Sequence, residues 1–164
     1  MSTAADELQY DRFLRMAQVQ LDKIFSDSPV GEVPRGRFRG TFIVAPGTVL
    51  TKTAAELIRL LVWQGKVFDT VRARVNNCVL PFGFESVPAK IYKAASWFDG
   101  RECVVLDYSE TSFVARWVRD EIRQVSLGVY LGKAYFAGMR MPDFILERSP
   151  AGDTRAPRFQ RVIP

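Results

Sequence analysis

The side chains best suited to acid–base or binding chemistry in this 164-residue sequence lie at positions 104–125, which read VVLDYSETSFVARWVRDEIRQV. The segment contains carboxylates, a tyrosine and arginines, and the whole chain has no histidine. The absence of histidine excludes Ser-His-Asp and Cys-His nucleophilic mechanisms within the chain. Any acid–base chemistry must therefore come from Asp, Glu, Tyr, Lys or water held by arginine.

The second half of this segment places charge on both faces of one predicted strand. Arg119, Asp120, Glu121 and Arg123 are nearly consecutive, and successive residues of a strand point to opposite faces. An ordinary half-buried strand keeps its charges on the solvent side. Before residue 119 both faces are largely apolar, so we expect one to line a barrel interior and the other to pack beneath a helix. The charged end then lies near a mouth of the barrel or under that helix.

Two interpretations of this charged cluster remain open. Arginines and carboxylates on neighbouring strands can pair and fix the strand register. Alternatively, some of them form the polar anchor of an apolar ligand cavity, with at least one arginine facing that cavity. The predicted acid–base residues are Asp107, Tyr108 and Asp120, with Tyr108 as the acid and an aspartate as the base. The predicted ligand-binding residues are Arg119, Arg123, Trp117, Asn77 and Tyr130.

Three further features carry weaker indications. Lys66 is either a nucleophile or anion contact, or a cation placed favourably at the end of a helix. Asn76 and Asn77 stand in a strand context that disfavours asparagine, so they mark an inward ligand contact or a bulge. Cys78 and Cys103 lack metal-ligand spacing and are too few for a disulfide framework. We therefore expect no metal site and no cofactor.

Two helices are predicted to accompany the β-structure. Over residues 5–26, apolar residues recur three and four positions apart, which is typical of one face of an amphipathic helix. Thr53 and Glu56 match a capping box, so a second helix is expected over 53–64, ending near Gly65.

The second half of the chain has the pattern of consecutive hairpins. Asp99-Gly100 marks one turn, Ser126-Leu127-Gly128 marks another, and residues 143–148 form a last short strand. Hairpins without intervening helices predict an antiparallel meander from about residue 89 to 136. We expect it to curl into a barrel or half-barrel, because closure removes exposed sheet edges.

Length and composition fit one globular domain, which we assign to residues 1–148, followed by a flexible basic tail over 149–164. Hydrophobic residues make up 48% and charged residues 25% of the chain, as in soluble proteins. No apolar run reaches the roughly 18 residues needed to span a bilayer, and the N-terminus lacks a signal-peptide pattern. We expect a cytoplasmic protein with no membrane partner. The net charge of +5 is partly a property of the tail, so we also expect no nucleic-acid partner.

Two regions resemble an uncharacterised bacterial domain, named for a Gly-x-Trp-x-x-Gly motif, and the domain that usually follows it. The first region is residues 34–40, PRGRFRG, followed by a predicted helix and the segment WQGKVF at 63–68. The second, residues 88–148, resembles the companion domain at Asp107-Tyr108, at DEIR over 120–123 and at Leu131-Gly132. Phe38 stands where the family has Trp, and Asp-Tyr is reversed. The resemblance implies a calycin-like barrel of the kind that holds hydrophobic ligands.

The expected fold is therefore α+β, an antiparallel β-barrel or strongly curled meander with two helices. The expected function is binding of a hydrophobic small molecule, with an acidic or polar head, in an apolar barrel cavity. The alternative is a small cofactor-independent enzyme, a cyclase, isomerase or decarboxylase, that uses Asp, Tyr and Arg groups in that cavity. A third hypothesis, a module that binds nucleic acid or protein, is supported only by the basic composition. Whether the protein is an enzyme and whether it forms a homodimer are left open.

Overall fold

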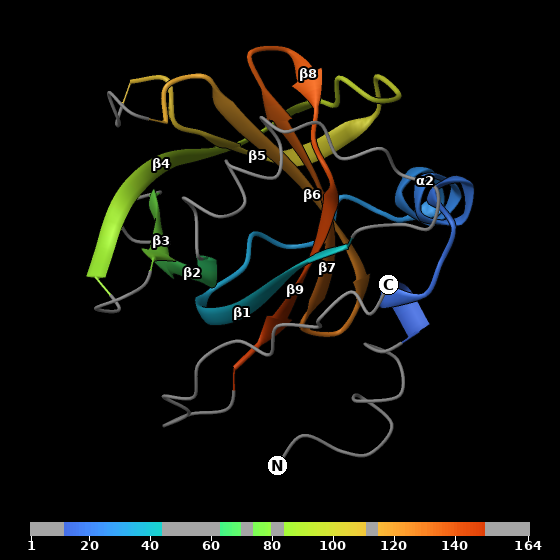
Figure 1. Ribbon diagram of the computed structural model, residues 1–164, viewed down its shortest axis with the longest axis horizontal. Coiled ribbons are helices and arrows are strands. Elements are labelled where there is room, and N and C mark those ends of the chain that lie inside the picture. Colours follow the sequence, from blue (N-terminus) through green and yellow to red (C-terminus); the bar gives the residue numbers. More distant parts are fainter. Residues whose placement is uncertain (1–11, 44–62, 70–73, 80–83, 111–114, 150–164) are drawn as a thin grey trace, which may run out of the picture.

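One curled antiparallel sheet dominates the computed structural model, which describes residues 12–43, 63–69, 74–79, 84–110 and 115–149 (Figure 1). Helix α2 (Gln18–Asp27) packs against its outer face. The strands are β1 (Gly36–Ile43), β2 (Trp63–Asp69), β3 (Arg74–Val79), β4 (Phe84–Ala95), β5 (Glu102–Asp107), β6 (Val118–Ser126), β7 (Val129–Phe136), β8 (Met139–Arg140) and β9 (Asp143–Arg148). This architecture confirms the predicted fold class.

The strand pairings close the sheet on itself. Strands β1 to β7 each pair with the next in sequence, and β9 pairs with both β7 and β1. Eight strands therefore form a ring in which each has two neighbours, and the two-residue β8 is an addition to β7. The predicted meander thus begins earlier than residue 89, at β1. Closure leaves these eight strands without an unpaired edge.

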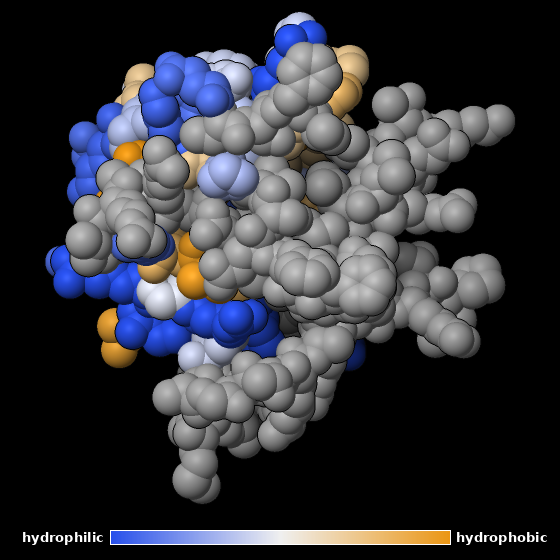
Figure 2. All heavy atoms as spheres, turned by 90° about the vertical axis from the view of Figure 1, so that its left-hand side faces the viewer, coloured by the Kyte–Doolittle hydropathy of each residue, from blue (hydrophilic) through white to orange (hydrophobic). Residues whose placement is uncertain are grey.

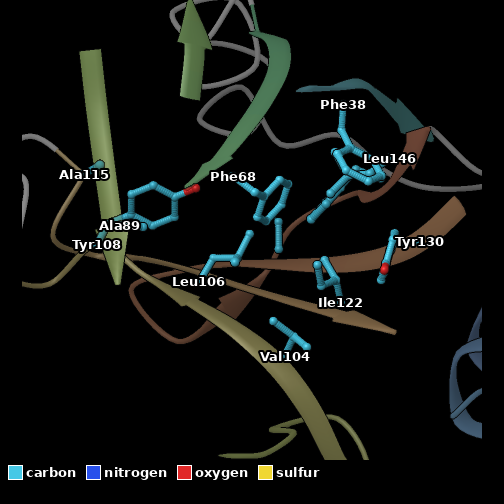
Figure 3. Packing of buried hydrophobic residues seen from close by; sticks show 12 residues of the cluster. Phe38, Phe68, Ala89, Val104, Leu106, Tyr108, Ala115, Ile122, Tyr130 and Leu146 are labelled. Carbon is cyan, nitrogen blue, oxygen red and sulfur yellow. The ribbon is translucent and has the colours of Figure 1, made fainter. Parts of the chain in front are cut away.

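Two apolar layers lie on the two faces of this wall. The inner layer lies on the barrel interior and includes Phe38, Phe68, Leu106, Ile122 and Tyr130 (Figure 3). The outer layer lies beneath α2, whose Leu21 and Phe25 are fully buried against the sheet. Strand residues alternate between the two layers, so one strand contributes to both. The expectation of one interior face and one face beneath a helix is confirmed.

The interior is closely packed around β7 and β9. A Cβ atom on Gly132 would lie 2.2 Å from the ring of Phe144, so only glycine leaves space for this ring. Phe38 packs edge-on against Phe68 and Tyr130, with ring centroids 5.4 and 5.7 Å apart. Aromatic side chains thus fill this part of the barrel.

The segment at residues 28–35 covers one end of the barrel. Its Val30 and Val33 pack against the inner layer. The Tyr130 hydroxyl donates to the Glu32 carbonyl over 2.9 Å, and the Glu32 amide donates to Gln124 over 3.2 Å. Tyr130 and Tyr108 lie at opposite ends of the inner layer (Figure 3). Tyr108 is therefore remote from the end that this segment closes.

Both predicted helices differ from the structure. Within the described part of the first prediction, residues 12–14 are helical, the helix is interrupted at 15–17, and α2 continues to Asp27. Most of the second predicted helix, residues 53–62, lies outside the described residues. Its predicted end is wrong, because Trp63 and Gln64 belong to β2 and Gly65 pairs with Arg39 on β1. Strand β2 pairs with β1 on one side and β3 on the other, and this pairing outweighs the local preference for a helix end near Gly65.

Two predicted turns and the last predicted strand agree with the structure. Gly100 and Gly128 both have a φ of 73°, the left-handed conformation expected of glycine in such hairpins. The final strand coincides with the predicted 143–148. Strand β5 ends at Asp107, which pairs with Arg119, and β6 starts at Val118. Of the predicted tail, residues 150–164 lie outside the described residues.

Candidate functional site

Strand β6 distributes its charged residues between the two faces of the wall. Asp120 pairs with Leu106 and Ala134, both members of the inner layer. Glu121 pairs with Val105, which belongs to the outer layer. By the period of two, Asp120 points into the barrel while Arg119, Glu121 and Arg123 point outward. The charged cluster predicted from the sequence is therefore two separate groups of residues.

Inside the barrel, Asp120 belongs to a network with Lys66 and Tyr108. The Lys66 ammonium donates to Asp120 Oδ2 over 2.7 Å and to the Tyr108 hydroxyl over 2.6 Å. The Tyr108 hydroxyl donates to the same Asp120 oxygen over 3.1 Å. The Lys66 and Asp120 side chains are only 2% and 8% exposed. We call these three residues the inner network.

The ring of strands brings the inner network together across the barrel. Lys66 lies on β2 and Asp120 on β6, and three strands separate β2 from β6 in either direction around the ring. The two strands therefore face one another, and the ion pair spans the interior. Tyr108 follows β5 directly and closes the triangle. Residues 54 positions apart in sequence meet only because the sheet closes.

The described neighbours of the inner network include apolar side chains of the inner layer. The Lys66 ammonium lies 5.3 Å from the centre of the Tyr108 ring and 5.7 Å from that of Phe144. A buried charge is costly without a partner, and here the ammonium and carboxylate neutralise each other. The three groups together offer a carboxylate base, a phenolic acid and a primary amine.

On the outer face, Arg123 is fully buried and holds several segments together. Its guanidinium binds both carboxylate oxygens of Asp99, over 2.6 and 2.7 Å, and donates to the carbonyls of Phe25, Arg101 and Glu102. The hydrogen bonds from Arg123 lower the pKa of Asp99 to about 2. Arg123 thus joins α2 to the β4–β5 hairpin. Its predicted role as a cavity-facing ligand contact is wrong, because its strand position points outward.

Arg119 and Asp107 also lie on the outer face. Arg119 pairs with Glu121 over 3.0 Å and stacks on the ring of Trp97 at 4.4 Å. Asp107 accepts a hydrogen bond from the Tyr92 hydroxyl over 2.9 Å. Burial opposes ionisation of Asp107, but hydrogen bonds from Ser109 and Tyr92 outweigh it and lower its pKa. The prediction of a cavity-facing arginine is therefore wrong, and Asp107 is separated from Tyr108 by the wall of the barrel.

The remaining predicted ligand contacts are dispersed. Trp117 lies in the turn before β6, is 54% exposed and stacks with Arg116. Tyr130 is interior but sits at the end closed by residues 28–35. Asn77 on β3 pairs in register with Lys66, and the β3–β4 register is irregular between Asn77 and Cys78, where a bulge was one of the two interpretations. Among the side chains that the structure describes, the predicted site residues Tyr108 and Asp120 contact each other inside the barrel.

A second buried lysine, Lys133 on β7, was not predicted as a polar centre. Its ammonium donates to Asp22 over 2.8 Å and to Asp143 over 3.0 Å, beneath α2. Gln18 and Arg140 bind the same two carboxylates, and we call these five residues the outer network. The sequence signal was Lys133 itself, a charge inside the apolar run VYLGKAYF.

The outer surface carries much of the chain's charge. Seen from the side of β2 to β4, the described residues are mostly hydrophilic, with smaller hydrophobic areas between them (Figure 2). Within the described ranges, no helix is long and apolar enough to cross a membrane. The same residues contain no group of three or more Cys, Asp or Glu side chains arranged to hold a metal ion.

Comparisons with known proteins give a structural relationship and no family. No family model matches the chain, and no curated protein matches it. A solved structure, described as the crystal structure of a protein from Thermomonospora curvata, is similar with a TM-score of 0.61. The alignment covers 83% of this chain and 90% of that one at 18% identity. At this identity the similarity supports the fold alone.

Proposed function

We propose that the protein binds a small hydrophobic molecule with a polar head group inside the barrel. The observation that carries this proposal is the inner network of Lys66, Tyr108 and Asp120, beside the apolar side chains that the structure describes in the barrel interior. Ligand sites typically combine apolar walls with a few placed polar groups, which is the composition found here. The polar head would exchange hydrogen bonds with these three side chains while the apolar part lies among the aromatic residues.

The energetics of the inner network favour a functional role over a purely structural one. Replacing a buried ion pair by well-packed apolar side chains is often neutral or stabilising. A pair that crosses a barrel interior at 2.7 Å therefore needs a reason other than stability. Recognition of a polar group is such a reason. Since residues 28–35 close the Tyr130 end, we expect the ligand to reach the network from the Tyr108 end.

A second candidate is the cofactor-independent enzyme, and one contact favours it. The Tyr108 hydroxyl lies 3.1 Å from Asp120, so a proton donor and a proton acceptor are adjacent at the same place. Such a pair suits an isomerisation in which one group removes a proton and the other supplies one. Arg119 and Arg123, which the sequence suggested as anchors, have no part in this enzyme hypothesis.

The experiment compares two interior tyrosines in a thermal-shift screen. Wild type, Tyr108→Phe and Tyr130→Phe are tested against hydrophobic acids, alcohols and ketones of matched carbon skeleton. We expect a subset of these compounds to raise the melting temperature of wild type and of Tyr130→Phe, and to lose this effect on Tyr108→Phe. Both variants lose only a hydroxyl, and Tyr130 binds the Glu32 carbonyl at the opposite end.

Circular dichroism of both variants serves as the folding control. The proposal fails if none of the compounds stabilises wild type. It also fails if Tyr108→Phe keeps the response that Tyr130→Phe loses, because the ligand would then lie at the Tyr130 end.

A further inference from the structure

We propose that Lys66 forms a covalent imine with the carbonyl carbon of a hydrophobic aldehyde bound inside the barrel. This inference rests on the proposed function, since the aldehyde occupies the same interior site. It narrows the ligand class from molecules with a polar head to reactive carbonyl compounds. It also assigns Lys66 the role of a nucleophile.

The first argument is the placement of an acid and a base at the amine. Imine formation requires a proton to leave the ammonium and another to reach the carbonyl oxygen. Asp120 lies 2.7 Å from the Lys66 nitrogen and is positioned to accept the first proton. The Tyr108 hydroxyl lies 2.6 Å from the same nitrogen and is positioned to protonate the oxygen of a carbonyl held there.

The second argument is that the reaction preserves the charge balance of the buried site. The ammonium and the aldehyde condense to a protonated imine and one water molecule, with no oxidant or reductant. The carbon–oxygen bond of the aldehyde breaks, a carbon–nitrogen bond forms, and the nitrogen keeps one proton. Its positive charge remains opposite Asp120, so the carboxylate is not left unpaired in an apolar interior.

The third argument is the apolar environment of the amine. Lys66 is 1% exposed, and its ammonium lies 5.3 Å from the centre of the Tyr108 ring and 5.7 Å from that of Phe144, both of the inner layer. Transferring the ammonium proton to Asp120 replaces two charges by two neutral groups, which costs less in apolar surroundings than in water. Desolvation is a recognised route to a nucleophilic lysine. Exclusion of water also slows hydrolysis of the product.

The chain contains its own control in Lys133. Lys133 is equally buried, but it donates to two carboxylates, Asp22 and Asp143, on the outer face beneath α2. Its nearest rings are those of Phe98 and Phe25, at 4.4 and 4.9 Å. Within the described residues no tyrosine hydroxyl is seen to bind it. If burial and ion pairing alone made a lysine reactive, Lys133 would react as Lys66 does.

The experiment is reductive trapping with a matched non-reactive ligand. The full chain is incubated with cinnamaldehyde and sodium cyanoborohydride, and the modified lysines are identified by peptide mass mapping. We expect Lys66 to be modified at least about a hundredfold faster than Lys133 or the exposed Lys23, the low end of what a positioned acid and base contribute. Cinnamyl alcohol, which has the same skeleton but no carbonyl, should raise the melting temperature and slow modification of Lys66.

Two variants connect the reaction to the site. Lys66→Arg keeps a cation opposite Asp120 and should fold without giving an adduct at position 66. Tyr108→Phe keeps the amine but loses the acid, and it should reduce the rate of modification by about a hundredfold.

Equal modification of Lys23, Lys66 and Lys133 would overturn the imine inference. So would an unmodified Lys66 in protein that cinnamyl alcohol still stabilises, and that result would leave the binding proposal standing. If neither compound stabilises the protein and Lys66 stays unmodified, the proposal of binding in this interior and the imine inference both fail for this skeleton.

Discussion

Lys66 and Lys133, the two lysines that are buried among the described residues, use similar interactions on opposite faces of one wall. Lys66 lies inside the barrel with one carboxylate and one tyrosine hydroxyl among its described partners, and Lys133 lies outside with two carboxylates. Both ammonium groups also approach aromatic rings. The partners of the two lysines are of similar chemical types, so the two sites differ in how the partner groups are hydrogen-bonded to one another.

The outer network is redundant in a way that suits attachment of a helix. Asp22 on α2 accepts hydrogen bonds from Lys133, Arg140 and Gln18, and Asp143 accepts from the same three side chains. Burial opposes ionisation of Asp22, but the hydrogen bonds from Arg140, Lys133 and Gln18 outweigh it and hold its pKa well below the usual value. Loss of one member leaves the others paired. In the inner network, Asp120 is the carboxylate that the described contacts give to both Lys66 and Tyr108.

The largest expected effect compares the two carboxylates directly. Asp120→Ala leaves the Lys66 ammonium without its described carboxylate partner in an apolar interior, and should cost about 3–5 kcal/mol of unfolding free energy. Asp22→Ala leaves Lys133 paired with Asp143 and should cost about 1 kcal/mol. Urea unfolding at neutral pH measures both. Equal losses would show that the two networks are equally redundant.

The next effect separates stability from recognition inside the barrel. The double substitution Lys66→Met with Asp120→Leu replaces the ion pair by apolar side chains and should recover at least the stability that Asp120→Ala loses, about 3–5 kcal/mol. It should also abolish stabilisation by any ligand that stabilises wild type. A double variant that is no more stable than Asp120→Ala would instead make the inner network a structural requirement.

A steric change tests how tightly the interior near Phe144 is filled. Gly132→Ala places a methyl group where the Phe144 ring now lies, and overpacking of this kind costs about 1–3 kcal/mol. The measurement is the urea midpoint together with the near-ultraviolet circular dichroism of the aromatic residues. An unchanged midpoint would mean that Phe144 has free space to move into.

Lowering the pH should reduce the stability that the ion pair of Asp99 with Arg123 contributes on the outer face. Because Arg123 lowers the pKa of Asp99 to about 2, the folded state binds the proton less readily than the unfolded chain. The stability from this pair is complete above pH about 4, the ordinary pKa of aspartate. It is lost as the pH falls through about 2. Asp99→Asn should be less stable than wild type at neutral pH and should converge with it in acid; parallel pH curves would contradict this.

The smallest expected effect concerns the closed end of the barrel. Tyr130→Phe removes the hydrogen bond to the Glu32 carbonyl and should cost about 1 kcal/mol. Hydrogen exchange of the amide groups in residues 28–35 should rise at the same time. Unchanged exchange would mean that Val30 and Val33 hold this segment without the hydroxyl.

The sequence predicted which residues lie on the same face of a strand, but not which strands face one another across the barrel. A period of two places Val104, Leu106 and Tyr108 on one side of the sheet and Cys103 with Val105 on the other, as the inner and outer layers show. The candidate site nevertheless combined Asp107 with Tyr108 and Arg119 with Asp120. Neighbours in a strand point to opposite sides, so closeness in sequence was misleading. Lys66 was considered both as a nucleophile or anion contact and as a cation at the end of a helix, and the helix end is wrong because strand β2 already begins at Trp63.

Closure of the ring depends on the strand that comes last among the eight. Arg39 on β1 and Glu147 on β9 are 108 residues apart, yet they lie side by side. Contacts of such long sequence separation make folding slow, because the entropy of closing the loop is paid first. Until β9 arrives, β1 and β7 each present an open edge that invites pairing with other chains. During synthesis, the span between the emergence of β1 and that of β9 is therefore the period in which this protein is most exposed to aggregation.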